Sequence, residues 1–244
     1  MIRNFRDLSI YTNREGKRLK ADKFIRSAAL VDLKAKDIVL LEKYDNLTVI
    51  DLRTDNERSE KPDYRVGNYC PLTLMENLPS GIAHDKKSKE AIVAKIPNMP
   101  ELYANLIKKE IGFNGIKEAF KIICDPAREG AVLWHCTEGK DRCGVVSALF
   151  LKLMDFDDEV IFEDYLKSGK GSKSRANKYY WIVRILLNNR QGAVAIKTAF
   201  SAKREFLQSA FEQIVSTYGS FDKFFEAIGI SAEDRERMKT RFLE

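Results

Sequence analysis

The residues best suited to chemistry gather in one short segment. It reads His135-Cys136-Thr137-Glu138-Gly139-Lys140-Asp141-Arg142-Cys143-Gly144. A strand-like apolar run, Ala131 to His135, leads into the cysteine, and a helix-like apolar run, Val145 to Leu151, follows the arginine. A cysteine six residues before an arginine is a weak signal alone, because such spacings also arise by chance. Between a strand and a helix, with a glycine in the loop, the spacing predicts an anion-binding loop.

The chemistry that fits this loop is attack on a phosphate by a cysteine thiolate. The amides from Thr137 to Arg142 and the N-terminus of the following helix carry partial positive charge, which binds anions and favours the thiolate form of Cys136. Arg142 offers a planar fork that can grip two phosphate oxygens. Gly139 permits close backbone approach or a positive φ. We therefore expect Cys136 to be the nucleophile, Arg142 and the loop amides to bind phosphate, and no metal or other cofactor to take part.

An inert buried thiol at a strand end is the plainer alternative for Cys136. An apolar core does not call for Lys140, Asp141 and Arg142 in succession, which speaks against that alternative. His135 is the reverse case. We expect a structural or loop-orienting role for it and not a direct catalytic one.

Residue patterns predict the elements that must position this loop. Short strands and turns are expected over residues 1–30, with a hairpin turn at 13–17, then a helix over 35–44 and a buried strand over 47–52. Later helices are expected over 116–123, 179–187, 204–218, 221–228 and 232–243, with Gly219 and Gly229 as helix stops. Strands before helices, with a strand–loop–helix at the centre, predict the α/β class: a central sheet flanked by helices.

The segment of about 76–112 differs from its surroundings. It holds Pro79, Pro97 and Pro100 among charged, helix-like pieces, with Pro71 just before it. Helices interrupted by prolines are typical of an insertion, so we expect a helical lid that covers the active site and moves. One domain is expected over 1–244, with this lid and a helical C-terminal part over about 155–244.

The composition is that of a globular chain, with 44% hydrophobic and 32% charged residues, which excludes a disordered or fibrous protein. The net charge of +6 is diluted by 36 acidic residues. The densest cationic run, Lys86, Lys87 and Lys89, is interpreted as a solvated helix face. No nucleic-acid-binding module is recognisable, so no nucleic-acid partner is expected.

The longest apolar runs are too short to span a bilayer, so no transmembrane segment is expected. Four cysteines in 244 residues do not form a disulfide framework. We therefore expect a reducing, cytoplasmic setting, although a secreted relative lacking its signal would look the same. The sequence leaves the oligomeric state open.

With its His-Cys-x-x-Gly-Lys-Asp-Arg loop, the chain resembles the bacterial atypical tyrosine phosphatases that also act on phosphoserine, phosphothreonine and phosphoinositides. Similar segments run along nearly the whole chain: Asn4 to Leu8, Phe24 to Leu30, Ile50 to Asp55 with Glu57, Pro62-Asp63, Asp164 to Ser168, and Tyr218 to Phe221. The resemblance implies a cysteine-phosphatase-like fold. It also implies hydrolysis of phosphorylated proteins or phosphoinositides through a phosphocysteine intermediate on Cys136.

The resemblance also supplies candidates for the general acid, which must protonate the leaving oxygen. Asp141 is the first candidate, because the family carries aspartate at this loop position. Asp55 is the second, at the end of a strand expected beside the loop. An ion pair or helix cap with Arg53 or Arg58 is weighed equally for Asp55.

Lys140 is a candidate for binding a second phosphate or an acidic group, as the lipid-active relatives imply; a solvent-facing lysine is the alternative. Arg6 and Asp7 are expected to brace the site as an ion pair, and Asn4 is left undecided. The residues expected to line the substrate site are Thr137, Glu138, Gly139, Lys140, Cys143 and Gly144.

Two departures from the family pattern stand out. Ser9 and Ile10 occupy positions where the family usually has two glycines. Cys143 stands where the family has threonine or serine, whose hydroxyl is thought to bond the nucleophile and help break the phosphocysteine. Because a thiol is a poorer donor, this departure affects turnover and not phosphate binding.

Two further functions stay open. One is a phospho-binding module with impaired catalysis, which Cys143 favours. The other is a thiol redox-regulated protein that pairs Cys136 with Cys143. The spacing of these two is wider than in the usual redox pair, and Arg142 between them has no redox role.

Overall fold

Strand β5 (Val132–Cys136) lies in the middle of a five-stranded sheet, where its apolar residues are buried. The computed structural model describes residues 1–77, 97–186 and 188–244 of the chain. The strand order is β1-β2-β5-β3-β4, so β5 pairs with β2 (Phe24–Ala28) on one side and β3 (Thr48–Asp51) on the other. Both pairings are parallel, as is usual for strands covered on both faces.

The edge strands of the sheet are less deeply buried. Strand β4 (Asn68–Pro71) runs parallel to β3, and β1 (Arg6–Asp7) runs antiparallel to β2. A short 3-10 helix, η1 (Leu8–Ile10), follows β1. The expected turn over 13–17 is confirmed, because Thr12 and Arg18 form an antiparallel bridge around it.

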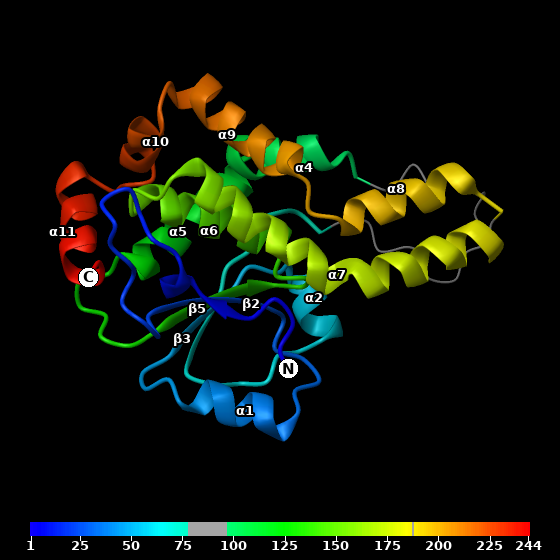
Figure 1. Cartoon of the computed structure of the whole chain (residues 1–244), viewed down its shortest axis with the longest axis horizontal. Coiled ribbons are helices and arrows are strands. Elements are labelled where there is room, and N and C mark those ends of the chain that lie inside the picture. Colours follow the sequence, from blue (N-terminus) through cyan, green and yellow to red (C-terminus); the bar gives the residue numbers. More distant parts are fainter. Residues whose placement is uncertain (78–96, 187) are drawn as a thin grey trace.

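Alternate residues of each strand point to opposite faces of the sheet, which creates two hydrophobic cores. In β5, Val132 and Trp134 belong to the larger core and Leu133 to the smaller one. Helix α1 (Ala35–Glu42) covers the smaller core through Leu41, on the opposite side of the sheet from α5 (Glu110–Ile123) and α6 (Asp141–Leu153) (Figure 1). The predicted α/β class, a central sheet flanked by helices, is therefore confirmed.

The remaining helices lie mainly on the side of the larger core (Figure 1). Their bounds are α2 (Asp55–Glu60), α4 (Met99–Lys108), α5 (Glu110–Ile123), α6 (Asp141–Leu153), α7 (Asp158–Leu186), α8 (Arg190–Phe200), α9 (Arg204–Tyr218), α10 (Phe221–Ala227) and α11 (Ala232–Phe242). None of the helices among the described residues is both long and apolar enough to span a membrane.

Most predicted elements match the structure, and three helices begin earlier than expected. Helix α5 begins at Glu110 and not at residue 116. Gly219 and Gly229 have positive φ angles and follow α9 and α10, as expected of helix stops. Helix α6 begins at Asp141 and not at residue 145, so Arg142 lies in its first turn. The helix expected over 179–187 is only the end of α7, because the polar residues before it carry no apolar period.

The expected lid over about 76–112 falls largely on residues 78–96, which lie outside the described residues. The described remainder from residue 99 onward forms α4 and the start of α5. Tyr103 and Leu106 of α4 are buried in the larger core. The expectation of a moving lid over about 76–112 stays a prediction.

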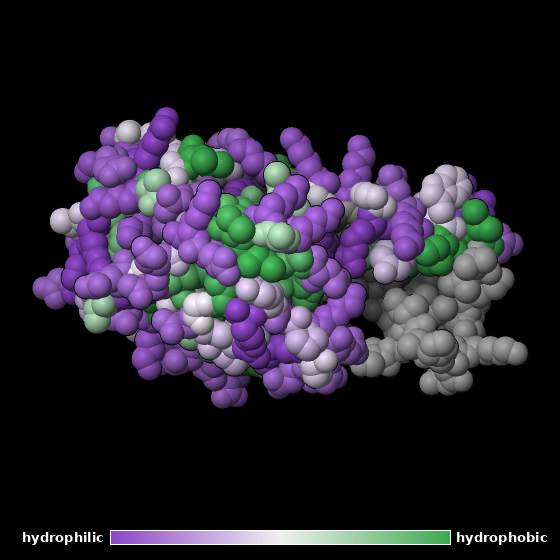
Figure 2. Space-filling model, turned by 90° about the horizontal axis from the view of Figure 1, so that it is seen from below, coloured by the Kyte–Doolittle hydropathy of each residue, from purple (hydrophilic) through white to green (hydrophobic). Residues whose placement is uncertain are grey.

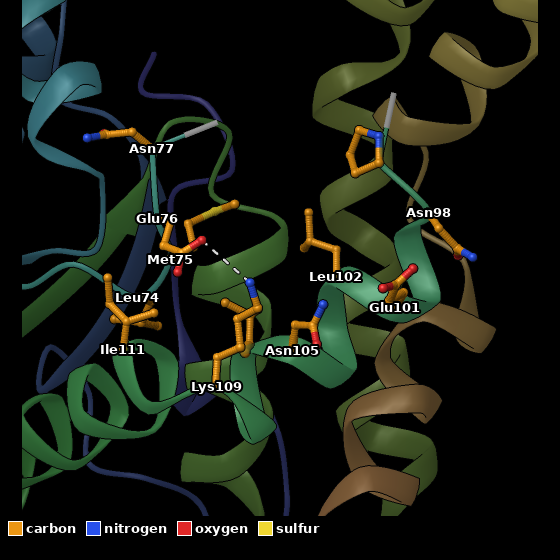
Figure 3. A pocket seen from close by; sticks show the side chains of 12 residues that line it. Leu74, Met75, Glu76, Asn77, Asn98, Glu101, Leu102, Asn105, Lys109 and Ile111 are labelled. Atoms are coloured by element: carbon orange, nitrogen blue, oxygen red, sulfur yellow. Dashed lines mark hydrogen bonds and ion pairs between the residues drawn. The ribbon is translucent and has the colours of Figure 1, made fainter. Parts of the chain in front are cut away.

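Both described ends beside that segment, Asn77 and Pro97, line one pocket of about 300 Å³ (Figure 3). Helix α4 forms one wall of the pocket, and Lys109 reaches Glu76 at 3.5 Å across it. The pocket is not lined by any residue of the segment from Cys136 to Arg142. It is therefore separate from the site described below.

Asp164 of α7 fastens that helix to the sheet. Its carboxylate accepts hydrogen bonds from Arg6 on β1 and from Arg26 on β2. Both arginines also donate to the Ser168 hydroxyl, at 2.9 and 3.2 Å. Burial acts to raise the pKa of Asp164, but the charges of Arg26 and Arg6 outweigh it and hold the pKa below its ordinary value.

The expected ion pair between Arg6 and Asp7 is wrong. Successive strand residues point to opposite faces, so Arg6 turns to Asp164 while Asp7 points away from it. The carboxylate of Asp7 instead accepts from the amides of Ser9, at 2.9 Å, and Asp22, at 2.6 Å.

Asp164→Asn is expected to destabilise the fold by about 3–5 kcal/mol at neutral pH, because two arginines lose their counter-charge. The loss should shrink toward about pH 3. A carboxyl with a lowered folded pKa stabilises fully above its unfolded pKa of about 3.9, and this contribution fades as pH falls through the folded pKa. Urea unfolding at both pH values measures the effect.

Asp45→Asn, at an exposed aspartate, is the matched control and should change little. A loss below about 1 kcal/mol at neutral pH, the range of a surface ion pair, would contradict this account of Asp164.

Candidate active site

Cys136 is the last residue of β5 and so lies at the carboxyl edge of the parallel strands. It is level with Ala28 at the end of β2, and only 2% of its surface is exposed. Residues 137–140 form a turn, and α6 begins at Asp141. The strand–loop–helix expected around Cys136 is confirmed. Crevices at this edge of a parallel sheet are where ligands usually bind.

The loop is held from its outer side by the N-terminal part of the chain. Three successive loop carbonyls accept hydrogen bonds from side chains there. The pairs are Arg3 with Thr137 at 3.5 Å, Asn4 with Glu138 at 2.8 Å, and Arg26 with Gly139 at 3.0 Å. In a trans peptide the carbonyl and the following amide point in opposite directions. The amides of residues 138–140 therefore point inward, away from these donors.

Gly139 is required by this shape. Its φ is +64°, which favours glycine. A Cβ atom at this position would lie 2.5 Å from the carbonyl oxygen of Ser27. The prediction that Gly139 allows a positive φ and a close backbone approach is confirmed.

The N-terminus of α6 adds positive charge at the same place. Its first hydrogen bond runs from the Gly144 amide to the Lys140 carbonyl, at 2.7 Å. The amides of residues 141–143 have no carbonyl partner within the helix, as in the first turn of any helix. Together with the inward loop amides, they form a set of donors beside Cys136 that suits an anion.

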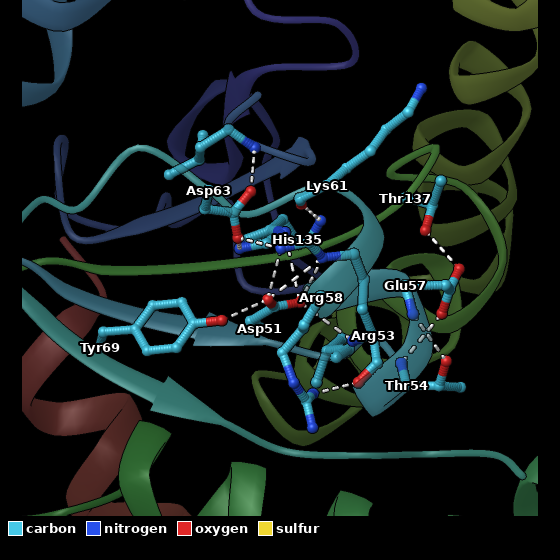
Figure 4. A network of polar contacts seen from close by, with 12 residues as sticks. Asp51, Arg53, Thr54, Glu57, Arg58, Lys61, Asp63, Tyr69, His135 and Thr137 are labelled. Atoms are coloured by element: carbon cyan, nitrogen blue, oxygen red, sulfur yellow. Dashed lines mark hydrogen bonds and ion pairs between the residues drawn. The ribbon is translucent and has the colours of Figure 1, made fainter. Parts of the chain in front are cut away.

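Arg142 is fixed by Glu57 from α2. Its Nη1 and Nη2 atoms donate to the two carboxylate oxygens of Glu57 at 2.6 and 2.7 Å, and Nη1 also donates to the Leu52 carbonyl at 3.2 Å. Thr137 donates its hydroxyl to the same carboxylate (Figure 4). Burial acts to raise the pKa of Glu57, but the hydrogen bonds and charge of Arg142 outweigh it and lower the pKa to about 2.

Asp141 faces a pair of buried tyrosines. Tyr103 of α4 donates its hydroxyl to Oδ1 of Asp141 at 2.6 Å, and the hydroxyls of Tyr103 and Tyr165 lie 2.7 Å apart. Burial raises the pKa of Tyr103 well above its ordinary value, so it stays a neutral donor. With 23% of its side chain exposed, Asp141 is accessible from solvent.

Asp55 lies at the N-terminus of α2, and 85% of its side chain is exposed. Arg58 donates to it at 2.6 Å, which is one of the ion pairs considered for this residue. The structure therefore places Asp141 in the Cys136 loop and Asp55 on a solvated surface. Which of the two transfers a proton stays a prediction.

Lys140 and Glu138 turn toward the helices that follow the loop. Lys140 is 1% exposed, so the alternative of a solvent-facing lysine is wrong. Its Nζ donates to the carbonyls of Ala199 and Ser201 at 2.6 and 2.8 Å and lies 3.0 Å from Asp141. Glu138 forms ion pairs with Arg3 at 2.7 Å and with Arg175 of α7. For Lys140 or Glu138 to contact a substrate, as predicted, the side chain would have to break these bonds and form new ones with the substrate.

Cys143 lies fully buried in α6, and its sulfur donates to the Trp134 carbonyl at 3.6 Å. Burial raises the pKa of Cys143 to about 11, so the thiol stays protonated. The thiolate is the form that attacks an oxidised sulfur, which speaks against a disulfide with Cys136. Gly144 packs against Tyr165, because a Cβ atom at position 144 would lie 3.0 Å from the Tyr165 ring.

His135 belongs to a buried polar network beside the loop (Figure 4). Its ring nitrogens lie 3.8 Å from Asp51 and 3.2 Å from Asp63. Arg53 donates to both carboxylates, and Tyr69 donates to Asp51 at 2.6 Å. Asp51, Asp63 and His135 are close enough to share a metal ion, but Arg53 already supplies positive charge between the carboxylates. This arrangement fits the structural role predicted for His135.

The residues that hold the loop are not part of the loop pattern. They are Asn4, Arg26, Glu57, Tyr103 and Asp164. Glu57 alone has a local signal, the Thr54-x-x-Glu57 capping box that starts α2. That pattern predicts the start of a helix, but it does not predict the hydrogen bonds between Glu57 and Arg142.

The known proteins that this chain resembles in sequence include phosphatases. A model of the tyrosine phosphatase family matches residues 1–244. A tyrosine-protein phosphatase of Nostoc commune is 25% identical over 235 residues, which cover 91% of this chain and 75% of that protein. The triple specificity protein phosphatase PtpB of Mycobacterium tuberculosis is 29% identical over 135 residues, which cover 52% of this chain and 49% of PtpB.

Two crystal structures of TpbA from P. aeruginosa are also similar. The complex with pTyr has a TM-score of 0.34 at 15% identity, covering 66% of this chain and 76% of that chain. The other structure has a TM-score of 0.35 at 16% identity, covering 80% and 90%. The family match extends over the whole chain, including the loop from Cys136 to Arg142, and this chain therefore belongs to the tyrosine phosphatase family.

Proposed function

We propose that this chain hydrolyses phosphotyrosine through a phosphocysteine intermediate on Cys136, with phosphoserine, phosphothreonine and phosphoinositides as further candidate substrates. One observation supports the mechanism most: the loop amides turn inward beside Cys136, and Arg142 is held next to them. Such fixed donors stabilise the charge that develops on a transferred phosphate. The name of the M. tuberculosis relative, a triple specificity protein phosphatase, supports the wider substrate range.

In the first step, the sulfur of Cys136 attacks phosphorus while the bond to the leaving oxygen breaks. The inward amides and Arg142 hold the other phosphate oxygens. Asp141 gives its proton to the leaving oxygen. Its Oδ1 atom already accepts from Tyr103, so Oδ2 is the atom we assign to the proton transfer. Asp55 is the second candidate for this role.

In the second step, water gives a proton to Asp141 and attacks phosphorus, the sulfur–phosphorus bond breaks, and phosphate leaves, which restores the Cys136 thiolate and the Asp141 acid. The family's hydroxyl at position 143 is replaced by a buried thiol that bonds the Trp134 carbonyl. We therefore expect breakdown of the phosphocysteine to be the slower step. In the extreme case, breakdown of the phosphocysteine would be so slow that the chain would act as a phosphate-binding module without turnover.

Cys136→Ser is expected to lower phosphate release by roughly 10⁴-fold or more, because the nucleophile is lost. Phosphate should still bind, since the loop amides and Arg142 remain. Steady-state assays and calorimetric titration with phosphate measure the two properties. Cys70→Ser, at a half-buried cysteine of β4, is the matched control. Near-normal turnover in Cys136→Ser would reject the cysteine mechanism.

Asp141→Asn is expected to slow hydrolysis of a phosphoserine peptide by roughly 10²-fold or more. An activated aryl phosphate should be affected much less, because its leaving group needs less protonation. Asparagine keeps an oxygen for the Tyr103 hydrogen bond, so the loop should keep its shape. Equal losses on both substrates would make Asp141 structural. A leaving-group-dependent loss in Asp55→Asn would then move the role to Asp55.

Glu57→Gln is expected to lower kcat/KM by roughly 10²-fold, because Arg142 loses the bidentate partner that orients it. Glu57 is a positioning residue, so separate kcat and KM values and phosphate affinity are the required readouts. Thr54→Ala is the control. It removes the other half of the capping box and should cost about 1 kcal/mol of stability with kcat/KM retained. If both variants lose activity in proportion to stability, Glu57 acts only as a helix cap.

A further inference from the structure

The second half of α7 and helix α8 form a hairpin that projects from the body of the molecule (Figure 1). It has a small core of its own, in which Val183, Ala193 and Ile196 are buried. Tyr180 and Phe200 pack against these three residues. The projecting part is therefore held together separately from the larger core.

The positive charge of the chain is concentrated in this segment. Residues 165–204 contain none of the 36 acidic residues of the chain and ten of its 42 basic residues. The rest of the chain has 32 basic and 36 acidic residues, a balance of −4. The net charge of +6 therefore comes entirely from the hairpin and its base.

Most of these cations have no carboxylate partner. Near the body, Arg175 pairs with Glu138, and Arg204 pairs with Glu159. Six others form no ion pair with any residue that the structure describes: Lys170, Lys173, Lys178, Arg184, Arg190 and Lys197. Five of these side chains are exposed and Arg184 is half-buried, so their charge can attract an anionic surface.

The hairpin also exposes large apolar side chains among these cations. Trp181 is 57% exposed and Ile185 68% exposed, and Ile182 is exposed beside them. Together with Lys178 they follow the i, i+3, i+4, i+7 spacing of one helix face, whereas Val183 points into the hairpin core. Figure 2 shows hydrophobic surface at this end of the molecule.

We propose that this hairpin docks on the surface of an anionic lipid bilayer. Tryptophan and isoleucine on a helix face flanked by lysine and arginine suit the boundary between headgroups and acyl chains. Each basic residue near such a surface strengthens binding. The attraction exerted by the six unpaired cations extends over the Debye length, which is about 10 Å at about 0.1 M salt. A bilayer supplies both the negative charge and the apolar layer that this face lacks.

Other occupants fit less well. Single-stranded nucleic acid stacks on aromatic rings, which Trp181 and Tyr179 offer, but it has no use for the exposed aliphatic side chains of Ile182 and Ile185. A second copy of the chain would bring the same positive charge against itself. These alternatives are separate outcomes of the experiment below.

The base of the hairpin touches the catalytic loop. Arg175 of α7 pairs with Glu138, and Lys140 donates to the Ala199 and Ser201 carbonyls at the end of α8. Docking would therefore bring the Cys136 loop to the membrane, where a lipid-linked or membrane-attached phosphate is presented. The docking itself does not rest on the proposed hydrolysis, since it is measured by binding alone.

The test uses the full chain carrying Cys136→Ser and vesicles in which about a third of the lipid is phosphatidylserine. This lipid is a phosphodiester, so the proposed monoester site does not consume it. Trp134 is buried and Trp181 is exposed, so a blue shift of tryptophan fluorescence reports insertion of Trp181. We expect co-sedimentation with these vesicles, a blue shift, and quenching by brominated lipid. Phosphatidylcholine vesicles should bind weakly, and about 0.5 M salt should release the protein.

Two variants separate charge from insertion. Lys178→Glu with Arg184→Glu should lower partitioning by well over tenfold, since each charge is worth about fivefold. Ile185→Ser should reduce binding and the blue shift. Val39→Ser on α1 and Lys117→Glu on α5 are exposed controls away from the hairpin and should bind normally. Circular dichroism confirms that each variant is folded.

Failure to bind phosphatidylserine vesicles at about 0.1 M salt would overturn the proposal, as would equal binding by the hairpin and control variants. So would salt-sensitive binding of a single-stranded oligonucleotide without vesicle binding. A concentration-dependent dimer that buries Trp181 and excludes vesicles would assign the face to a second copy instead.

Discussion

Asp164 is the carboxylate on which the geometry of the Cys136 loop depends. Arg26 reaches the Gly139 carbonyl as a fully buried guanidinium, and a buried cation is stable only with a counter-charge. Asp164 supplies that charge from α7, 138 residues along the chain, and shares it with Arg6. The inward direction of the loop amides therefore rests on an ion pair between the sheet and the C-terminal helices. This dependence makes the helical C-terminal part necessary for the site.

A second arginine, Arg142, is also fixed by a carboxylate, that of Glu57. Arg142 already has a bidentate carboxylate partner, so its orientation does not wait for substrate. Because Glu57 balances its charge, a phosphate dianion bound as proposed would draw the rest of its stabilisation from the amides and the α6 N-terminus. Donors that are fixed before the reaction need no reorganisation when charge develops. The two pairs, Arg26 with Asp164 and Arg142 with Glu57, therefore hold opposite sides of one anion site.

The sequence was sufficient for the parts of this site that are local. The strand, the loop glycine and the helix around Cys136 follow from residue types over some twenty positions, and the structure confirms them. The partners of the loop could not be predicted, because they come from separate segments that only the fold brings together. Arg6 shows the limit: its neighbour Asp7 was the obvious partner by sequence, but the strand pleat sends the two side chains apart. The acid-free segment 165–204 was visible in the sequence, yet its meaning needs the observation that its middle part forms a hairpin that projects from the body.

Lys140 connects the chemistry of the loop with the position of the hairpin. Its ammonium group is enclosed by two carbonyls at the end of α8 and by Asp141, which satisfies its three N–H donors. The same group cannot hold α8 in this position and bind a second phosphate at the same time. A substrate contact by Lys140 therefore requires the base of the hairpin to shift, and the carbonyls of Ala199 and Ser201 would then need water or another donor. Any binding of a second phosphate by Lys140 is thus linked to the placement of the hairpin, because both depend on the same buried ammonium group.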